Sequence, residues 1–129
     1  MILVTGGMAQ GKRAFVERQL AGEGPVSWVD AAVATEEELC SASFCFNFHA
    51  FVRRALSGEV EVDLNALVGR LLAERPKRVI VADQIGCGIV PLEREERLYR
   101  EETGRICCRL AAGASQVWLI TCGIGRRIK

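Results

Sequence analysis

A glycine-rich segment near the N-terminus has the spacing of a phosphate-binding loop. Gly6, four further residues and then Gly11-Lys12 follow a short apolar run and precede a helical pattern. In such a loop, backbone N–H groups surround phosphate oxygens, the helix N-terminus adds positive potential, and the lysine reaches the terminal phosphates. Lys12 is therefore a candidate catalytic residue. The predicted nucleotide-binding residues are Gly6, Gly7, Met8, Ala9, Gln10, Gly11, Lys12 and Arg13.

The residue after the lysine departs from the usual pattern. A Ser or Thr normally stands there, and its hydroxyl holds Mg²⁺. Here the residue is Arg13, whose guanidinium cannot ligate a metal and would repel one. Either Arg13 points away from the phosphates or its charge replaces that of the ion. We expect ATP or GTP as the ligand and no metal-ligating residue, and the role of Mg²⁺ is in doubt.

Three further polar residues bear on the chemistry. Asp83 ends the apolar run 79–82 as the acidic residue of a Walker B strand does, so it is a catalytic candidate that could bind a metal or accept a proton. A helix or turn cap is the alternative role. The adjacent Gln84 has no carboxylate and cannot act as a base. His49 lies among phenylalanines in an amphipathic pattern, which favours a packed or rim histidine over a nucleophile.

These residues must be positioned by alternating strands and helices. Apolar β-branched runs predict strands at 2–5, 26–29, 79–82 and 117–121. Helical spacing predicts helices near 14–20, after the capping box that starts at Thr35, and over 48–56, 64–72 and 92–112. In the last helix Leu98, Ile106 and Leu110 are expected to face inward. After Gly125 we expect a basic tail. This order predicts an α/β, P-loop NTPase-like three-layer fold with a mainly parallel sheet.

Composition limits the remaining possibilities. The 129 residues, half of them hydrophobic, suit a single P-loop nucleotide-binding domain over residues 1–129. Lys and Arg number 17 against 16 Asp and Glu, so nucleic acid is not expected as a partner. The six cysteines fit no zinc-site spacing. No secretory signal or membrane-length apolar stretch is visible, and we expect a cytoplasmic protein with reduced thiols.

Ordered blocks of the chain resemble the adenosylcobinamide kinase / adenosylcobinamide-phosphate guanylyltransferase family of cobalamin biosynthesis. The resemblance is loose over residues 1–20 and close over residues 77–129. Its blocks are 2–7, Gly11-Lys12, 86–91, Gly104-Arg105, 109–112, 117–119 and 123–129. The resemblance implies a P-loop fold, a nucleotide and a corrinoid as ligands, and a homo-oligomer, which is a trimer in the family. It also implies phosphorylation of a corrinoid side-chain hydroxyl, followed by GMP transfer through a guanylylated histidine.

The chain departs from that family where chemistry would take place. The His-rich, Arg-containing stretch of the guanylylated histidine is not found, since only a Glu-rich helix is expected between Asp30 and Phe44. Asp83-Gln84 stands where the family typically has Asn-Glu, and Cys107-Cys108 replaces Asn-Gln. The resemblance therefore indicates a shortened, divergent member that binds ATP or GTP and, if active, is a cobinamide kinase without histidine-dependent guanylyl transfer.

Two alternatives remain open. One is a catalytically degenerate nucleotide-binding or assembly paralogue of that enzyme, and the other is an unrelated P-loop phosphotransferase. Phe44, Phe46, Phe48 and Phe51 are expected to fill the core or a subunit interface rather than to stack on a corrinoid.

Overall fold

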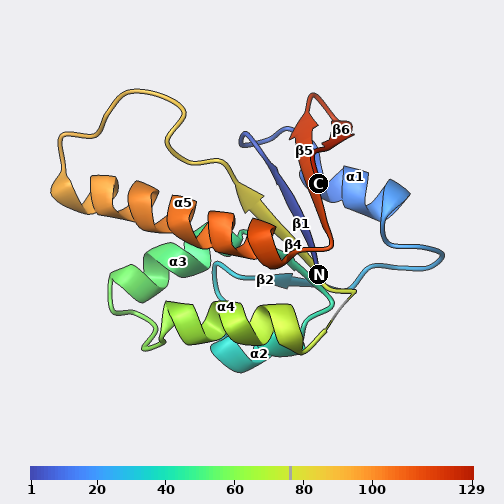
Figure 1. The fold of residues 1–129 in the computed structure, drawn as a ribbon, viewed down its shortest axis with the longest axis horizontal. Helices are drawn as coiled ribbons and strands as arrows, with labels where there is room; N and C mark the ends of the chain where they lie inside the picture. Colours follow the sequence, from blue (N-terminus) through green and yellow to red (C-terminus); the bar gives the residue numbers. More distant parts are fainter. Residues whose placement is uncertain (76) are drawn as a thin grey trace.

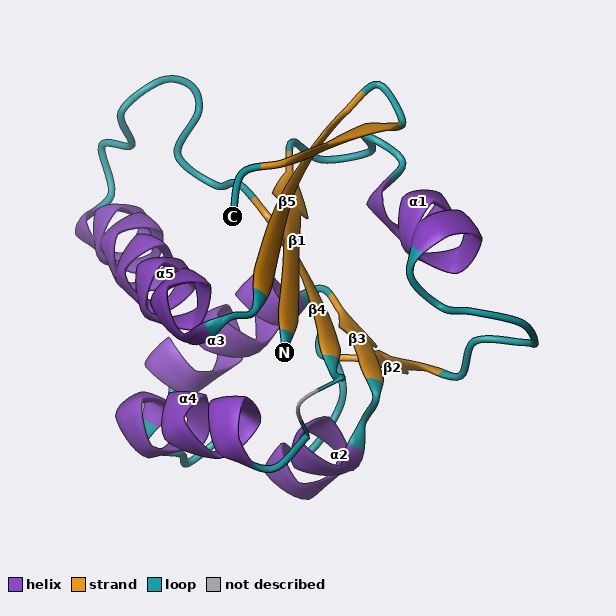
Figure 2. Ribbon diagram, turned by 45° about the vertical axis from the view of Figure 1, so that its right-hand side comes forward, coloured by secondary structure: helices purple, strands orange, loops and turns teal. Residues whose placement is uncertain are grey.

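The computed structural model describes residues 1–75 and 77–129. One six-stranded sheet has the order β2-β3-β4-β1-β5-β6, and helices cover both of its faces (Figures 1 and 2). The strands are β1 (Ile2–Gly6), β2 (Trp28–Asp30), β3 (Phe44–Phe46), β4 (Val79–Asp83), β5 (Gln116–Thr121) and β6 (Ile124–Arg127). The helices are α1 (Lys12–Gln19), α2 (Glu36–Ser41), α3 (Phe48–Leu56), α4 (Leu64–Ala73) and α5 (Arg94–Gly113).

The layers follow from the alternation of side chains along the central strands. In β1, Leu3 joins the larger core under α3, α4 and α5, whereas Val4 joins a smaller core with Phe15 and Val16 of α1. Figure 2 shows α1 on one side of the sheet and α3, α4 and α5 on the other. The first five strands are parallel and β6 is antiparallel to β5. The protein therefore has the predicted three-layer α/β fold with a mainly parallel sheet.

Local sequence fixes the start of α2 as predicted. The Thr35 hydroxyl accepts a hydrogen bond from the Glu38 N–H at 3.2 Å, and the Glu38 carboxylate accepts one from the Thr35 N–H at 2.8 Å. This reciprocal pair satisfies N–H groups that a helix N-terminus leaves without partners. Helix α4 begins in a similar way, because the Asp63 side chain accepts from the N–H groups of Asn65 and Ala66.

Two strands and one helix register differ from the prediction. Strand β3 lies directly before the expected helix over 48–56, where no strand was predicted, and β6 forms part of the expected basic tail. The prediction that Leu98 faces inward is wrong, because this side chain is 47% exposed and Tyr99 is buried in its place. The inward face of α5 starts at Tyr99 and continues through Thr103, Ile106 and Leu110, which lie three or four residues apart on one side of the helix.

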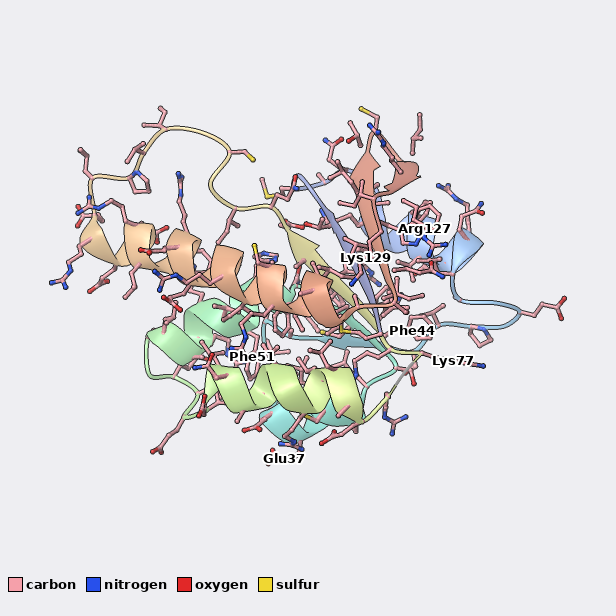
Figure 3. The ribbon with its side chains drawn as sticks, viewed as in Figure 1. Glu37, Phe44, Phe51, Lys77, Arg127 and Lys129 are labelled. Carbon is pink, nitrogen blue, oxygen red and sulfur yellow. The ribbon has the colours of Figure 1, made fainter. Side chains whose placement is uncertain are left out.

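The aromatic residues divide between the two layers. Phe48 and Phe51 of α3 are fully buried in the larger core, as the core prediction requires. Figure 3 shows Phe51 among the helices of that layer. Phe44 and Phe46 of β3 are only half-buried and pack edge-on against Trp28 of β2, beside the smaller core.

A buried arginine joins two helices to the sheet. Arg78, at 1% exposure, precedes β4 and donates hydrogen bonds to the carbonyl groups of Cys40, Ala42 and Leu71. These carbonyls belong to the C-terminal turns of α2 and α4, where the helix dipole favours a cation. Within the described residues, none of the helices is both long and apolar enough to cross a membrane.

Candidate functional site

The candidate phosphate loop follows the central strand of the sheet. Strand β1 lies between β4 and β5, and its last residue Gly6 is level with Asp83 on one side and Ile120 on the other. Ligands of α/β sheets bind at such a point, beyond the carboxyl ends of adjacent strands whose connections leave on opposite faces. Gly6 is required there, because a Cβ atom would lie 2.3 Å from the Ile120 carbonyl oxygen. Gly11, with φ of +83°, ends the loop where α1 begins.

The two predicted catalytic residues are in direct contact. The Lys12 ammonium lies 2.6 Å from one carboxylate oxygen of Asp83 and donates a hydrogen bond to the Gly7 carbonyl at 2.5 Å. Lys12 is 7% exposed and the Asp83 side chain is 18% exposed. An ion pair this enclosed is screened little by solvent, so the lysine charge and the carboxylate are held together at the end of β4.

The hairpin formed by β5 and β6 holds the opposite side of the loop. The Gln10 carbonyl accepts a hydrogen bond from the Gly123 N–H at 2.8 Å, and the Gln10 side-chain oxygen accepts one from the Cys122 N–H at 2.7 Å. Gly125 packs so closely on α1 that a Cβ atom would lie 2.2 Å from the Phe15 ring. The hairpin therefore positions the loop. In the sequence, the closely spaced Gly123 and Gly125 are the signal that could have indicated this role of the hairpin.

Arg13 lies beside the loop with its guanidinium over aromatic rings. The guanidinium carbon is 4.3 Å from the centre of the Phe46 ring and 5.3 Å from that of Trp28, and such contacts are attractive for a cation. These rings belong to β3 and β2, and Phe46 lines a cavity of about 490 Å³. The loop residues from Met8 to Arg13 line this cavity together with Asn47 and Asp83.

The residues around this cavity do not fit an Mg²⁺ ion held by a hydroxyl and a carboxylate. Position 13 offers a guanidinium in place of the hydroxyl, and the Asp83 carboxylate is paired with Lys12. Among the described residues, no group of three or more His, Cys, Asp or Glu side chains could hold a metal ion.

His49 contacts Asp83, a neighbour that the sequence did not indicate. The ring Nδ1 accepts a hydrogen bond from the Asp83 backbone N–H at 3.1 Å, and Nε2 lies 3.9 Å from the other carboxylate oxygen of Asp83. Burial lowers the pKa of His49, although the nearby Asp83 carboxylate opposes this shift. The ring is thus neutral near pH 7, with Nδ1 occupied and the proton assigned to Nε2. It has no free lone pair for nucleophilic attack, in agreement with the packed or rim histidine that the sequence favours.

A second cavity, of about 420 Å³, lies on the other side of Asp83. Its walls include His49, Gln84 and three residues from α3 and α5 that pair with one another. In that cluster Arg53 donates two hydrogen bonds to Glu96, at 2.7 and 3.1 Å. Its guanidinium carbon also lies 4.1 Å from the centre of the Tyr99 ring. Asp83 borders both cavities. The arrangement could therefore hold a phosphoryl group on one side of the carboxylate and its acceptor on the other.

Comparison with known proteins gives matches over part of the chain. The model of a family described as cobinamide kinase / cobinamide phosphate guanyltransferase matches residues 43–128. The chain is 42% identical over 81 residues to the bifunctional adenosylcobalamin biosynthesis protein CobU of Salmonella typhimurium, a match that covers 63% of this chain and 42% of that protein. It is 36% identical over 76 residues to the protein of the same description from Escherichia coli, covering 59% of this chain and 42% of the relative.

The matches cover only part of this chain and part of each relative. The chain spans less than half the length of the curated relatives that it matches. The residues that the family model matches include His49, Asp83 and Gln84, and they begin after the candidate phosphate loop.

Proposed function

The chain belongs to the cobinamide kinase / cobinamide phosphate guanyltransferase family, and on that premise we propose that it binds ATP or GTP through residues 6–13 and phosphorylates a cobinamide hydroxyl. The observation that carries this proposal is the contact of Lys12 with Asp83 beside the loop. A cation for the transferred phosphoryl group and a carboxylate for the acceptor proton are the groups that such a transfer needs.

The free hydrogen-bond donors of the site support phosphate binding. A lysine ammonium has three N–H donors, and Asp83 and the Gly7 carbonyl take two of them. The third donor is available for a terminal phosphate oxygen, and the backbone N–H groups of the loop provide further donors. As Lys12 moves towards the phosphate, the carboxylate of Asp83 becomes free to accept the proton of the attacking hydroxyl. The hydroxyl oxygen then bonds to phosphorus, and the nucleoside diphosphate leaves.

Arg13 and His49 define how this member would differ from its relatives. With Arg13 in place of a hydroxyl residue, we expect nucleotide binding that does not require Mg²⁺. His49 is the single histidine of the 129 residues, and its Nδ1 is already hydrogen-bonded. We therefore expect no guanylyl transfer through histidine. The trimer implied by the family resemblance and the cytoplasmic location expected from the sequence stay predictions.

A second candidate function is a nucleotide-binding or assembly paralogue without catalysis. Arg13 and Gln84 favour this alternative, because the first removes a metal ligand and the second removes a carboxylate next to Asp83. The two functions differ in one outcome, which is whether bound nucleotide gives phosphorylated cobinamide.

Calorimetric titration of ATP and GTP, with Mg²⁺ and with EDTA, tests the proposal. Lys12→Ala should abolish binding, whereas Lys77→Ala should leave it unchanged, because Lys77 is exposed and lies before β4, at the opposite end of that strand from Asp83. Equal binding by both variants would refute the nucleotide site. Binding followed by transfer of labelled phosphate from ATP to cobinamide supports the kinase, and binding without transfer supports the paralogue.

A further inference from the structure

A third cavity borders Asp83 on the face of the sheet that α5 covers. Its volume is about 400 Å³. Leu3 of β1, Val117 of β5 and Ile85 give it largely apolar walls, and Thr103 and Gly104 of α5 line the opposite side. Asp83 and Gln84 border both this cavity and the second one, so the two spaces lie next to each other beneath the segment that follows β4.

Thr103 has a buried hydroxyl that lacks a partner. The residue is 1% exposed, and among the described residues no group hydrogen-bonds to its Oγ1 atom. A buried polar group without a hydrogen bond destabilises a fold by roughly 1–3 kcal/mol, and such groups in native proteins call for an explanation. A ligand in the cavity that carries an amide or hydroxyl group would supply the missing hydrogen bond.

Gly104 leaves open space at the same wall. Glycine in a helix interior costs about 1 kcal/mol relative to alanine, and Gly104 lies in the middle of α5. A Cβ atom there would meet no atom within 4 Å, whereas at Gly113 of the same helix it would lie 2.7 Å from the Leu72 side chain. Packing within the chain therefore explains the glycine at 113 but not the one at 104.

The third cavity differs in charge from the neighbouring second cavity, and this difference indicates the class of ligand that the third cavity suits. In the second cavity, Arg53 is already paired with Glu96, and Arg100 donates to the Ile89 carbonyl. The third cavity instead offers apolar walls and one unpaired hydroxyl. This combination suits an uncharged, largely apolar group that bears an amide, with Asp83 at the end nearest the phosphate loop.

We propose that the third cavity binds an amide-bearing side chain of the cobinamide acceptor, with Thr103 Oγ1 hydrogen-bonded to the amide and Gly104 leaving room for it. The inference rests on the proposed function, since it places the acceptor of that reaction. The bound hydroxyl would reach Asp83 from the side opposite to the nucleotide.

Spectroscopic titration of cobinamide, in parallel with calorimetric titration of ATP, tests this assignment. Gly104→Leu fills the cavity and should weaken cobinamide binding at least tenfold while ATP binding stays as in the wild type. Gly69→Leu is the matched control, because Gly69 is an exposed helical glycine of α4 with equally open space and lies outside the cavity. Thr103→Val, which removes only the hydroxyl, should weaken cobinamide binding roughly three- to tenfold.

The outcomes separate this inference from the proposed function. Wild-type affinity for cobinamide in Gly104→Leu, or no cobinamide binding by the wild type, overturns the inference even if ATP binds. A change of oligomeric state in Gly104→Leu would assign the cavity to a contact between copies and would also overturn it. Failure of the wild type to bind ATP or GTP would instead refute the proposed nucleotide site.

Thiol alkylation provides a readout that needs no variant. Cys108 is exposed at the cavity, and Cys122 is exposed on the hairpin outside it. Cobinamide should slow alkylation of Cys108 and leave the rate at Cys122 unchanged. Equal rates with and without cobinamide at Cys108 would contradict the proposal.

Discussion

Replacing Asp83 by asparagine should weaken the fold and strengthen nucleotide binding at the same time. Asp83 pairs with Lys12 at 2.6 Å, and the two side chains are 18% and 7% exposed. Asp83→Asn keeps the shape of the side chain but removes its negative charge, so the lysine charge is left with neutral acceptors such as the Gly7 carbonyl. The nucleotide phosphates would then have no carboxylate to compete with for Lys12.

The burial of the pair sets the size of the effect. Removing one partner of a buried ion pair costs 3–5 kcal/mol, and an exposed pair contributes about 1 kcal/mol or less. Because this pair is mostly but not fully enclosed, the free energy of unfolding should fall by about 2–3 kcal/mol. Removal of the negative charge next to the phosphates should tighten ATP binding by about tenfold, or 1.4 kcal/mol. ATP at 100 times its Kd would then restore about 2.7 kcal/mol.

Urea unfolding with and without ATP, together with calorimetry, measures both effects. Asp30→Asn is the control, because Asp30 also ends a strand and accepts hydrogen bonds from Asn47 and the Ala32 N–H at 3.0 Å, yet it is not paired with Lys12. If Asp83→Asn is as stable as the wild type, or binds ATP more weakly, then the ion pair does not hold Lys12 as the structure implies. Phosphoryl transfer by Asp83→Asn should fall by a factor of roughly 10²–10⁴, as expected for loss of a general base.

Substitutions at three other positions test the supports of the site. Arg78→Met removes the guanidinium that donates to three buried carbonyls, so the free energy of unfolding in urea should fall by about 3 kcal/mol. Arg78→Lys should lower it by roughly half as much. Equal stability of the wild type and Arg78→Met would refute the stabilising role of Arg78. Because burial lowers the pKa of His49, the unfolded state binds more protons below pH 6.5, so stability should fall more on acidification in the wild type than in His49→Gln. Gly125→Ala should push the hairpin away from Phe15 and weaken ATP binding several-fold without abolishing folding, which calorimetry and circular dichroism would check.

Sequence periodicity predicted the elements whose pattern is local. The capping box at Thr35, the amphipathic faces of α3 and α4 and the apolar runs of β1, β4 and β5 all produce the expected elements. Strand β3 was missed because its three residues run directly into α3, which begins at Phe48. Three residues are too few to show a period of two against an adjacent helix.

The contacts of the site are less predictable than its residues. Spacing alone indicated Lys12 and Asp83, but only the parallel register of β1 with β4 brings Gly6 level with Asp83. The role of His49 beside Asp83 depends on a hydrogen bond between α3 and the end of β4. Neither helix periodicity nor composition contains that information, because it arises from how the third layer packs on the sheet.

The parallel arrangement explains why the loop and its supports can persist where individual reactive groups differ. All five parallel strands place their carboxyl ends at one edge, so the loop after β1, the segment after β4 and the hairpin turn after β5 converge there. Two of the contacts that shape this edge involve backbone, namely the packing of Gly6 against the Ile120 carbonyl and the hydrogen bond from the Gly123 N–H to the Gln10 carbonyl. Arg13 and Gln84 can replace a hydroxyl and a carboxylate without altering these contacts, because neither side chain takes part in them. The scaffold and the chemistry are therefore separable in this chain, and measuring nucleotide binding and phosphoryl transfer independently is the way to determine which of the two it keeps.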